Sequence, residues 1–447
     1  LRANWWKVLR DPAALSAGIV LSAFALITLA DSVHFRRALA PAPGATAATP
    51  TYYATTAESV LDVWLARQIG MRETGYSEPL AYLGLTKEPI ERDGQPVRDY
   101  PRLKHGGAHL SDPQAQWKTD LIGRALAGVA GGLLLAAGLA FIPAFLVRRS
   151  HGGMLGALKA IAGDHTDLPL RAVGATLLAM CVVGGAIVAL MGHYHVFGTD
   201  RTGNDVLYQS LKSVRTAFVI GTLATVATLP FAVVLGVLAG YFRGWVDEVI
   251  QYVYTTLSSV PNVLLIAACV LMVQVFLDKN PDLFETGLER SDLKIFLLCV
   301  ILGLTGWATL CRLVRGETLK LRELDFVQAA TAFGVSHARI MARHIAPNVM
   351  HLVLITTVLS FSELILYEAV LTYVGVGVDP STNSFGGMIN LARTEMSRDP
   401  VVWWSFAAAF AFMVTLVLSA NFFADGVRDA FDPRARSFRP RFKRSIA

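Results

Sequence analysis

The sequence predicts an all-α membrane protein with about eight transmembrane helices. Of its 447 residues, 53% are hydrophobic and only 17% are charged, whereas a soluble globular protein carries about 25% charged residues. Its mean hydropathy is +0.47. Eight apolar runs recur along the chain, and each is long enough for a helix to cross the roughly 30 Å of hydrocarbon in a bilayer. This composition excludes a disordered or collagen-like chain, and four cysteines in such a length exclude a disulfide framework.

The predicted spans are mostly bounded by charged residues, proline or glycine. They cover residues 13–30, 121–147, 171–191, 214–240, 256–277, 295–314, 350–373 and 401–424. The first lies where a signal peptide would lie, but Trp5-Trp6-Lys7 in front of it is typical of an interfacial anchor, and no A-x-A cleavage site follows closely. We therefore treat it as a span.

Lysine and arginine predict the orientation, because short cytoplasmic loops are enriched in them. If the N-terminus is inside, 20 of the 40 Lys and Arg lie in the inside segments 1–12, 148–170, 241–255, 312–349 and 425–447. Only six lie in the short outside loops 192–213, 278–293 and 375–400. We therefore expect both termini in the cytoplasm. The net charge of +6 then reflects membrane orientation and does not indicate a nucleic-acid partner.

Segment 31–120 differs from the rest because it contains no run of span length. It has three prolines near its start, mixed charges and several aromatic residues, and its length of about 90 residues suits a small extracytoplasmic domain. Thr55-x-x-Glu58, followed by Val60 and Leu61, predicts an amphipathic helix with a capping box.

No sequence motif indicates catalysis or metal binding. The chain lacks G-x-x-x-x-G-K-[ST], H-E-x-x-H, G-x-S-x-G and a helix-opening G-x-G-x-x-G. His105 and His109 are separated by two glycines, which indicates a loop, and we interpret His193 and His195 as residues solvated at a membrane edge. The cysteines form no C-x-x-C pair, so they indicate neither zinc nor redox chemistry.

Two acidic residues within a predicted span are candidates for function, because charges are costly in a bilayer. Glu363 and Glu368 are five residues apart, which places them about 140° apart on a helix, so they cannot line one narrow stripe. Glu363 lies deeper, and either lines a solute path or pairs with a neighbouring helix or subunit. Glu368 lies near the outer end, where it reaches water or caps a neighbour.

The 312–349 loop is helix-prone, amphipathic and basic. Phe326, Ala330 and Gly334 recur every four residues, as do Ala329 and Phe333, which predicts one helical face. Small residues on such a face let a partner's backbone approach, and the helix then sits in a groove of that partner. A solvated surface helix is the alternative. Pro347 is expected to stop the second helical piece before the next span.

Six segments in the same order resemble binding-protein-dependent ABC importer permeases. QAATAFG at 328–334 with HIAPN at 344–348 is similar to the cytoplasmic EAA loop of that family. The other segments resemble its dipeptide, oligopeptide and nickel branch, specifically the C-type permease subunit. They are GTDRTGNDVL at 198–207, GYFRGWVD at 240–247, GWATLCRLVR at 306–315, EAVLTYVGVG at 368–377 and DGVRDAFDP at 425–433.

The chain departs from this family in three respects. Gln328 stands where the family usually has Glu, and Asn204 stands where it usually has Arg. Six spans suffice for the family, and eight are predicted here. We therefore expect an insertion. The expected parts are 1–30, a tail and first span; 31–120, an extracytoplasmic inserted domain; 121–191, two additional spans; 192–424, the permease core; and 425–447, a basic cytoplasmic tail.

The resemblance implies one half of the translocation pathway of an ATP-driven importer in the bacterial inner membrane. Its implied partners are a B-type permease subunit, two ATP-binding subunits and an extracytoplasmic solute-binding protein, with peptides or peptide-like solutes as cargo. It implies no enzyme activity and no cofactor for this chain, because ATP and magnesium would be bound by the partner ATPase subunits.

The resemblance also assigns roles to residues of this sequence. An ATPase subunit is expected to contact Gln328, Ala329, Ala330, Gly334, Arg339, Arg343, His344 and Pro347. The path or its outer gate is expected to include Glu363, Glu368, Gly375, Gly377, Asp379 and Phe385. Two other classes compete with this interpretation. One is a proton-coupled secondary transporter that uses Glu363 and Glu368, and the other is a membrane-bound enzyme with a catalytic 31–120 domain.

Overall fold

The computed structural model describes residues 2–38, 53–54, 57–92, 95–147, 153–164, 166–281 and 287–431. Helices make up most of these residues. The helices are α1 (Arg2–Arg10), α2 (Pro12–Ser32), α3 (Val60–Trp64), α4 (Ala66–Gly70), α5 (Pro113–Val147), α6 (Met154–Ala162), α7 (Leu170–Met191), α8 (Val206–Phe242), α9 (Gly244–Ser259), α10 (Asn262–Lys279), α11 (Gly287–Arg322), α12 (Asp325–Ala332), α13 (His337–Ile340), the π-helical turn η2 (Met341–Ile345), α14 (Ala346–Tyr373), α15 (Phe385–Glu395) and α16 (Trp404–Phe431). The strands are β1 (His34–Phe35), β2 (Glu58–Ser59), β3 (Glu88–Arg92) and β4 (Gln95–Asp99).

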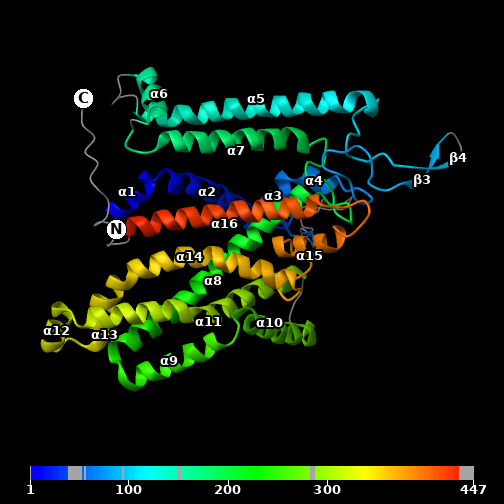
Figure 1. Cartoon of the computed structure of the whole chain (residues 1–447). Helices are drawn as coiled ribbons and strands as arrows, with labels where there is room; N and C mark the ends of the chain where they lie inside the picture. Colours follow the sequence, from blue (N-terminus) through cyan, green and yellow to red (C-terminus); the bar gives the residue numbers. More distant parts are fainter. Residues whose placement is uncertain are drawn as a thin grey trace, which may run out of the picture.

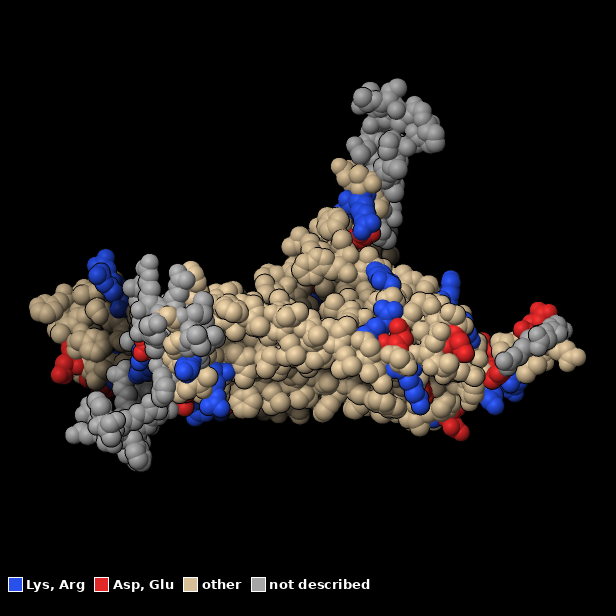
Figure 2. Space-filling view, turned by 90° about the horizontal axis from the view of Figure 1, so that it is seen from above, with Lys and Arg blue, Asp and Glu red and all other residues tan. Residues whose placement is uncertain are grey.

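Eight helices of the described residues are long and apolar enough to cross a membrane, which confirms the predicted number of spans. They are α2, α5 as far as Pro143, α7, α8, α10, α11 from Glu289, the continuous helix His337–Tyr373, and α16. Most run along one long axis (Figure 1). Charged side chains gather toward the two ends of the visible face and are nearly absent from its middle (Figure 2). Such a belt matches the apolar core of a bilayer.

The bundle has two distinct ends (Figure 1). We call one the α12 end; it also holds α1, α6 and the end of α16. We call the other the α15 end; it holds α3, α4, β3 and β4. The start and finish of the described chain meet at the α12 end, where the rings of Trp5 and Phe431 are 5.5 Å apart. The predicted boundary at 425 falls inside α16, and residues 432–447 of the predicted tail lie outside the described residues.

Helices α8 and α11 form the centre of the bundle, and glycines let their backbones approach closely. A Cβ on Gly236 would lie 2.8 Å from the Cys311 carbonyl oxygen, and one on Gly303 would lie 2.6 Å from the Ala227 Cβ. Small residues are favoured where membrane helices touch, because association there depends on close packing. Larger side chains at these positions would separate the two helices.

Helices α5 and α7 form a hairpin packed in the same way. A Cβ on Gly132 would lie 2.2 Å from the Cys181 carbonyl oxygen, and one on Gly185 would lie 2.4 Å from the Gly128 carbonyl oxygen. The hairpin lies on the α2 side of the bundle, above α2 in Figure 1, and α7 contacts α2. It therefore lies on the opposite side of the bundle from α9 and α10.

The described residues between α2 and α5, which we call the α2–α5 segment, contain two small antiparallel pairings. Strand β1 pairs with β2, and β3 pairs with β4 as a hairpin. The predicted cap at Thr55 was wrong, because α3 begins at Val60 and Ser59 caps it; the Ser59 and Asp62 side chains form a reciprocal capping box. Thr55 itself lies outside the described residues, and Glu58 belongs to β2.

The predicted span 256–277 is interrupted. Its first residues end α9, and α10 begins at Asn262. Pro261 has no N–H and keeps the preceding residue extended, which agrees with the backbone angles of Val260 (φ −90°, ψ 134°). The 312–349 loop also begins later than predicted, because α11 continues to Arg322.

Candidate functional site

The α12 end presents a short helix on a fixed support. Helix α12 ends in a Schellman motif, in which the Val335 N–H donates to the Ala330 carbonyl (3.1 Å) and the Gly334 N–H donates to the Thr331 carbonyl (3.0 Å). Gly334 has a φ of +72°, which glycine adopts without steric cost. Gly334 therefore turns the chain out of α12, and it does not lie on a helical face as its spacing suggested.

One side of α12 is buried in this chain. Val327 and Ala330 join a core cluster with Tyr241 of α8 and Trp307 of α11. Ile345 of the π-helical turn packs in the same cluster. The Ala330 side chain faces the bundle and helps to hold α12 in place, and its contact with a partner stays a prediction.

The opposite side of α12 is open. The side chains of Gln328, Ala329 and Phe333 are exposed, and Phe333 is 86% accessible. Arg339 and Arg343 are exposed on the following helical piece, and His344 is partly exposed. A shallow hollow of about 500 Å³ lies beside α12, between Gln328, Thr331 and the end of α8 at Phe242. The described surface here combines apolar, amide and basic groups.

Pro347 does not stop the helix as predicted. It lies in the first turn of α14, and the chain is helical without interruption from His337 to Tyr373. The preceding turn is π-helical, and the Ala346 N–H donates to the Met341 carbonyl. The Asn348 side chain donates to the His344 carbonyl at 2.6 Å. The wider turn accommodates the missing proline N–H, so the segment after α12 is one continuous rod.

Ion pairs fix the neighbouring helices at this end. The Arg315 guanidinium of α11 donates to Asp247 of α9, with Nη2 to Oδ2 at 2.7 Å, and Arg243 pairs with Glu323. The hydrogen bonds from Arg315 lower the pKa of the Asp247 carboxyl despite its partial burial. The α8–α9 corner and the end of α11 are therefore held together beneath α12.

Glu363 and Glu368 lie in different environments on α14. Glu363 is exposed on the surface of this chain, and the Tyr367 hydroxyl donates to its Oε1 at 3.1 Å. Glu368 is completely buried, and its Oε1 accepts a hydrogen bond from Thr372 at 2.8 Å. In this conformation Glu363 is open to a partner or solute, whereas Glu368 is enclosed within the bundle.

The expected gate residues lie around the end of α14. Gly375 closes α14 in a second Schellman motif with a φ of +89°. Gly377 is buried, and a Cβ there would lie 1.9 Å from the Thr372 hydroxyl oxygen. Phe385 has no exposed surface and packs in the core at the start of α15. In this conformation the Phe385 side chain is enclosed in the core, and its role at the gate stays a prediction.

Asp379 is the charged member of this group. It accepts hydrogen bonds from the Ser381 N–H (3.0 Å) and hydroxyl (2.7 Å), and the Lys294 ammonium lies 4.0 Å away. Burial alone would raise the pKa of Asp379, but the Ser381 hydrogen bonds and the nearby positive charges of Lys294 and Arg290 lower it. Asp379 is thus an ionised anchor for the α14–α15 turn.

A buried ionic cluster, which the sequence did not reveal, ties the α2–α5 segment to the start of α8. His195 is completely buried, with Nδ1 2.8 Å from Asp205 Oδ2 and Nε2 3.4 Å from Glu73 Oε1. Glu73 also accepts hydrogen bonds from the backbone N–H groups of residues 104–106. The interpretation of His195 as an interfacial, solvated residue was therefore wrong. Glu73 is 122 residues away in sequence, and no spacing rule links the two.

The same contacts shift the pKa values of the cluster. Burial disfavours protonated His195, but Asp205 and Glu73 outweigh it and raise the pKa of His195 to about 9. Burial would raise the pKa of Glu73, but the hydrogen bonds from His195 and from three backbone N–H groups lower it to about 2. At neutral pH the cluster thus contains an imidazolium between carboxylates.

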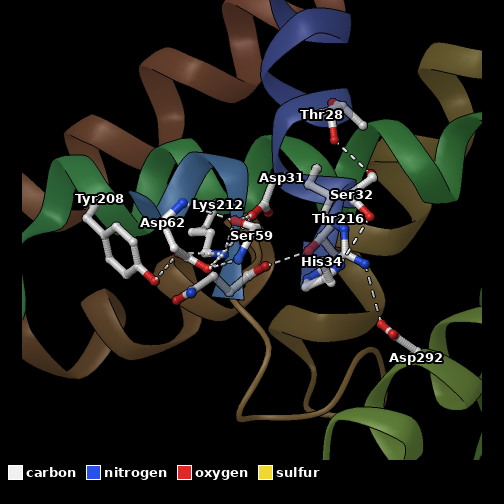
Figure 3. A network of polar contacts seen from close by, with 12 residues as sticks. Thr28, Asp31, Ser32, His34, Ser59, Asp62, Tyr208, Lys212, Thr216 and Asp292 are labelled. Carbon is white, nitrogen blue, oxygen red and sulfur yellow. Dashed lines mark hydrogen bonds and ion pairs between the residues drawn. The ribbon is translucent and has the colours of Figure 1, made fainter. Parts of the chain in front are cut away.

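A second cluster joins α2, α3 and α8 (Figure 3). The Lys212 ammonium lies 2.6 Å from Asp31 Oδ1 and 2.8 Å from Asp62 Oδ1. The Ser59 hydroxyl donates to Asp31 at 2.7 Å, and the Tyr208 hydroxyl donates to Asp62 at 3.1 Å. These side chains come from α2, from the consecutive elements β2 and α3, and from α8, so they fix the α2–α5 segment over the end of the bundle.

A third set of contacts reaches α15 and α16. The Tyr76 hydroxyl donates to Glu395 Oε1 at 3.0 Å. The Trp404 indole donates to the Thr199 carbonyl at 3.0 Å, and the Thr199 hydroxyl donates to the Gly75 carbonyl at 2.7 Å. The α2–α5 segment is therefore attached both to the beginning of α8 and to the last two helices.

The chain is similar in sequence to known transport proteins. Residues 232–437 match the model of a family described as "Binding-protein-dependent transport system inner membrane component". The oligopeptide transport system permease protein OppC of Mycobacterium tuberculosis (strain ATCC 25618 / H37Rv) is 32% identical over 254 residues, which are 57% of this chain and 81% of the relative. OppC of Haemophilus influenzae is 32% identical, over 55% of this chain and 72% of the relative. OppC of Escherichia coli (strain K12) is 31% identical, over 55% and 74%.

Proposed function

Since the chain belongs to the family of binding-protein-dependent transport system inner membrane components, we propose that it is one half of the pathway by which an ATP-driven importer moves peptides or peptide-like solutes. Three relatives are oligopeptide transport system permease proteins, and eight apolar helices make this chain a multi-pass membrane protein. A membrane-bound enzyme and a proton-coupled transporter find no support in these relatives.

The observation that carries the proposal is the exposed side of α12 on its rigid support. A short helix whose apolar and small residues remain uncovered in its own chain suits a groove in a partner. We infer that the partner is an ATP-binding subunit, which Gln328, Ala329 and Phe333 contact directly. Arg339 and Arg343 stand beside this face, where they suit acidic groups of the same subunit.

The support explains how movement of the partner would reach the pathway. Val327 and Ala330 hold α12 against α8 and α11, and the rod from His337 to Tyr373 runs from α12 to the gate residues. Closure of two ATP-binding subunits would shift α12 and tilt this rod, which exchanges one packing of the helices for another. ATP and magnesium belong to those subunits in this scheme.

The remaining partners and the orientation follow from the same proposal. A B-type permease subunit would complete the pathway, and a solute-binding protein would deliver cargo at the α15 end. We place the α12 end, with both ends of the described chain, in the cytoplasm, because the short inside segments carry more Lys and Arg than the short loops expected outside. The α2–α5 segment and the α5–α7 hairpin are then additions to a six-span core.

Substitutions at Gly334 test the contact with the ATP-binding subunit. Gly334→Glu places a charged side chain at the end of α12, where a Cβ meets nothing in this chain, so we expect the complex to reach the membrane with uptake and transport-coupled ATPase activity abolished. Gly334→Asn is the matched control, because Asn tolerates a positive φ, and it should retain most of both activities.

Two outcomes would contradict the assignment. Normal uptake by Gly334→Glu would show that no subunit packs closely here. An equal loss in Gly334→Asn and Gly334→Glu would show that backbone geometry at this turn, and not a contact with the partner, controls uptake.

A further inference from the structure

A carboxylate lies uncovered in the middle of an apolar helix. Glu363 is exposed and is ten residues before Tyr373, the last residue of α14. At 1.5 Å per residue it lies about 15 Å from that end, which is about half of the hydrocarbon thickness of a bilayer. An ionisable group at this depth does not face lipid, because its desolvation is too costly; it faces a water-filled cavity or another protein group.

The surroundings of Glu363 are polar and belong to a broken helix. The Tyr367 hydroxyl donates to Glu363 and also contacts the Asn262 side chain at the start of α10. Tyr367 therefore lies level with the junction of α9 and α10, where Val260 and Pro261 are exposed. Non-helical backbone at membrane depth occurs where it is buried in protein or lines a water-filled cavity. The described residues of this chain do not bury the non-helical backbone at Val260 and Pro261.

The exposed end of α9 adds to this polar surface. Thr255, Ser258 and Ser259 are exposed just before the break. Transporters place solute sites at helix breaks, because the interrupted backbone supplies polar groups there. The exposed polar residues at the α9–α10 break are therefore a second observation, beside Glu363 itself, that favours contact with a solute over contact with lipid.

The charge of this surface is negative. Among the described residues, no Lys, Arg or His forms an ion pair with Glu363. Four basic residues of α8 and α11 face carboxylates other than Glu363, namely Lys212, Arg215, Lys294 and Arg315. The Arg312 guanidinium lies over the Tyr254 ring of α9, at 5.4 Å. Tyr367 and Asn262 offer a hydroxyl and an amide, which orient the carboxylate without neutralising it. Glu363 is thus available to a cation.

We propose that Glu363, held by Tyr367 at the α9–α10 break, is a specificity-determining residue of the translocation pathway. It favours solutes that carry an ammonium or guanidinium group in the part of the molecule that passes it, and it disfavours solutes with an added carboxylate. This inference rests on the proposed function, because it requires that the exposed side of α14 lines the pathway.

The test uses the complete importer, with its partner subunits and solute-binding protein, reconstituted in liposomes. The tripeptides Ala-Lys-Ala, Ala-Gln-Ala and Ala-Glu-Ala are compared at saturating, peptide-loaded binding protein, so that maximal rates report the pathway and not delivery. In Glu363→Gln, the ratio of the Ala-Lys-Ala rate to the Ala-Glu-Ala rate should fall by about threefold to thirtyfold, the range expected for one charge pair at partly hydrated distances. The Ala-Gln-Ala rate should change little.

Leu366→Gln is the matched control, because Leu366 is exposed nearly one turn further along the same helix and the change adds an amide without removing a charge. It should leave the ratio of rates unchanged. An unchanged ratio in Glu363→Gln, or an equal fall in Leu366→Gln, would overturn the inference.

A second measurement separates this inference from the proposed function. The variant Glu363→Cys should react with a membrane-impermeant thiol reagent, above the background of the four native cysteines, in at least one state of the transport cycle. No reaction in any state would show that Glu363 pairs with the partner permease, and the inference would fail while peptide uptake persisted. Failure of the wild-type importer to move any of the three peptides would instead contradict the proposed cargo, and the accessibility of position 363 would still decide whether it lines a path.

Discussion

Replacement of His195 by Gln should loosen the α2–α5 segment from the start of α8. The imidazolium is completely buried between Asp205 and Glu73, and Glu73 in turn holds the backbone N–H groups of residues 104–106. Glutamine removes the positive charge and leaves two carboxylates near each other. The backbone hydrogen bonds to Glu73 should then open more often.

The size of the effect follows from the pKa of His195. Its rise from the usual 6.5 to about 9 corresponds to about 3 kcal/mol, since each pKa unit is worth about 1.4 kcal/mol. The lowered pKa of Glu73 reflects the same ion pair together with three backbone hydrogen bonds, so it is not added. A loss of this size would make local opening about a hundredfold more frequent.

The pH dependence has a definite sign. His195 has a higher pKa when folded, so its contribution is complete below pH 6.5 and is lost as the pH rises through about 9. Glu73 has a lower pKa when folded, so its contribution is complete above pH 4.5 and is lost as the pH falls through about 2. Both contributions are therefore complete between pH 4.5 and 6.5.

Hydrogen exchange of residues 104–106, measured by mass spectrometry on the purified complex and expressed as protection factors, checks this expectation. At pH 6, His195→Gln should lower protection about a hundredfold, whereas His193→Gln should not, because the His193 side chain is outside the cluster. Wild-type protection should decline between pH 7 and 9.5, and the variant should lack this decline. Protection within about threefold of wild type in His195→Gln at pH 6, or a flat wild-type profile up to pH 9.5, would refute the reasoning.

Two further substitutions test the packing of the bundle. Gly132→Leu should lower the stability of the detergent-purified protein by about 1 to 3 kcal/mol, because a Cβ there meets the Cys181 carbonyl oxygen at 2.2 Å. Gly131→Leu is the control and should not lower it, because a Cβ there meets nothing within 4 Å. Equal melting temperatures of the two variants would contradict the glycine packing of α5 and α7. Lys212→Met should destabilise the protein by about 3 to 5 kcal/mol, because it leaves buried carboxylates unpaired. Adding Asp31→Asn should recover part of the lost stability. No recovery in the double variant would argue against the ion pair.

The spans and the family could be predicted from the sequence because both depend on local signals. An apolar run of 20 residues needs no partner to be recognised, and the motif order from Gly198 to Pro433 is read along the chain. The α9–α10 break was missed although Pro261 is visible, because the apolar residues continue on both sides of it.

The environments of individual side chains were harder to predict from the sequence. The four-residue spacing in α12 predicted a face, but periodicity does not say which side meets the bundle, and Ala330 packs against the bundle. His195 and Glu73 meet only in the folded chain. Likewise, nothing in the sequence around Phe385 distinguishes a buried residue at the start of a helix from a residue that lines a gate.

The three attachments of the α2–α5 segment also set an order for its assembly during synthesis. The glycines of α5 and α7 pack against each other, and α7 contacts α2. The α5–α7 hairpin can therefore make these contacts once residue 191 has been synthesised. His195 and Lys212 follow almost at once. Glu395, which binds Tyr76, and Trp404, which binds Thr199, are made 200 and 209 residues after His195. The α2–α5 segment is therefore secured in part by a helix made much later, and a chain truncated before α16 would lack the bond from Trp404.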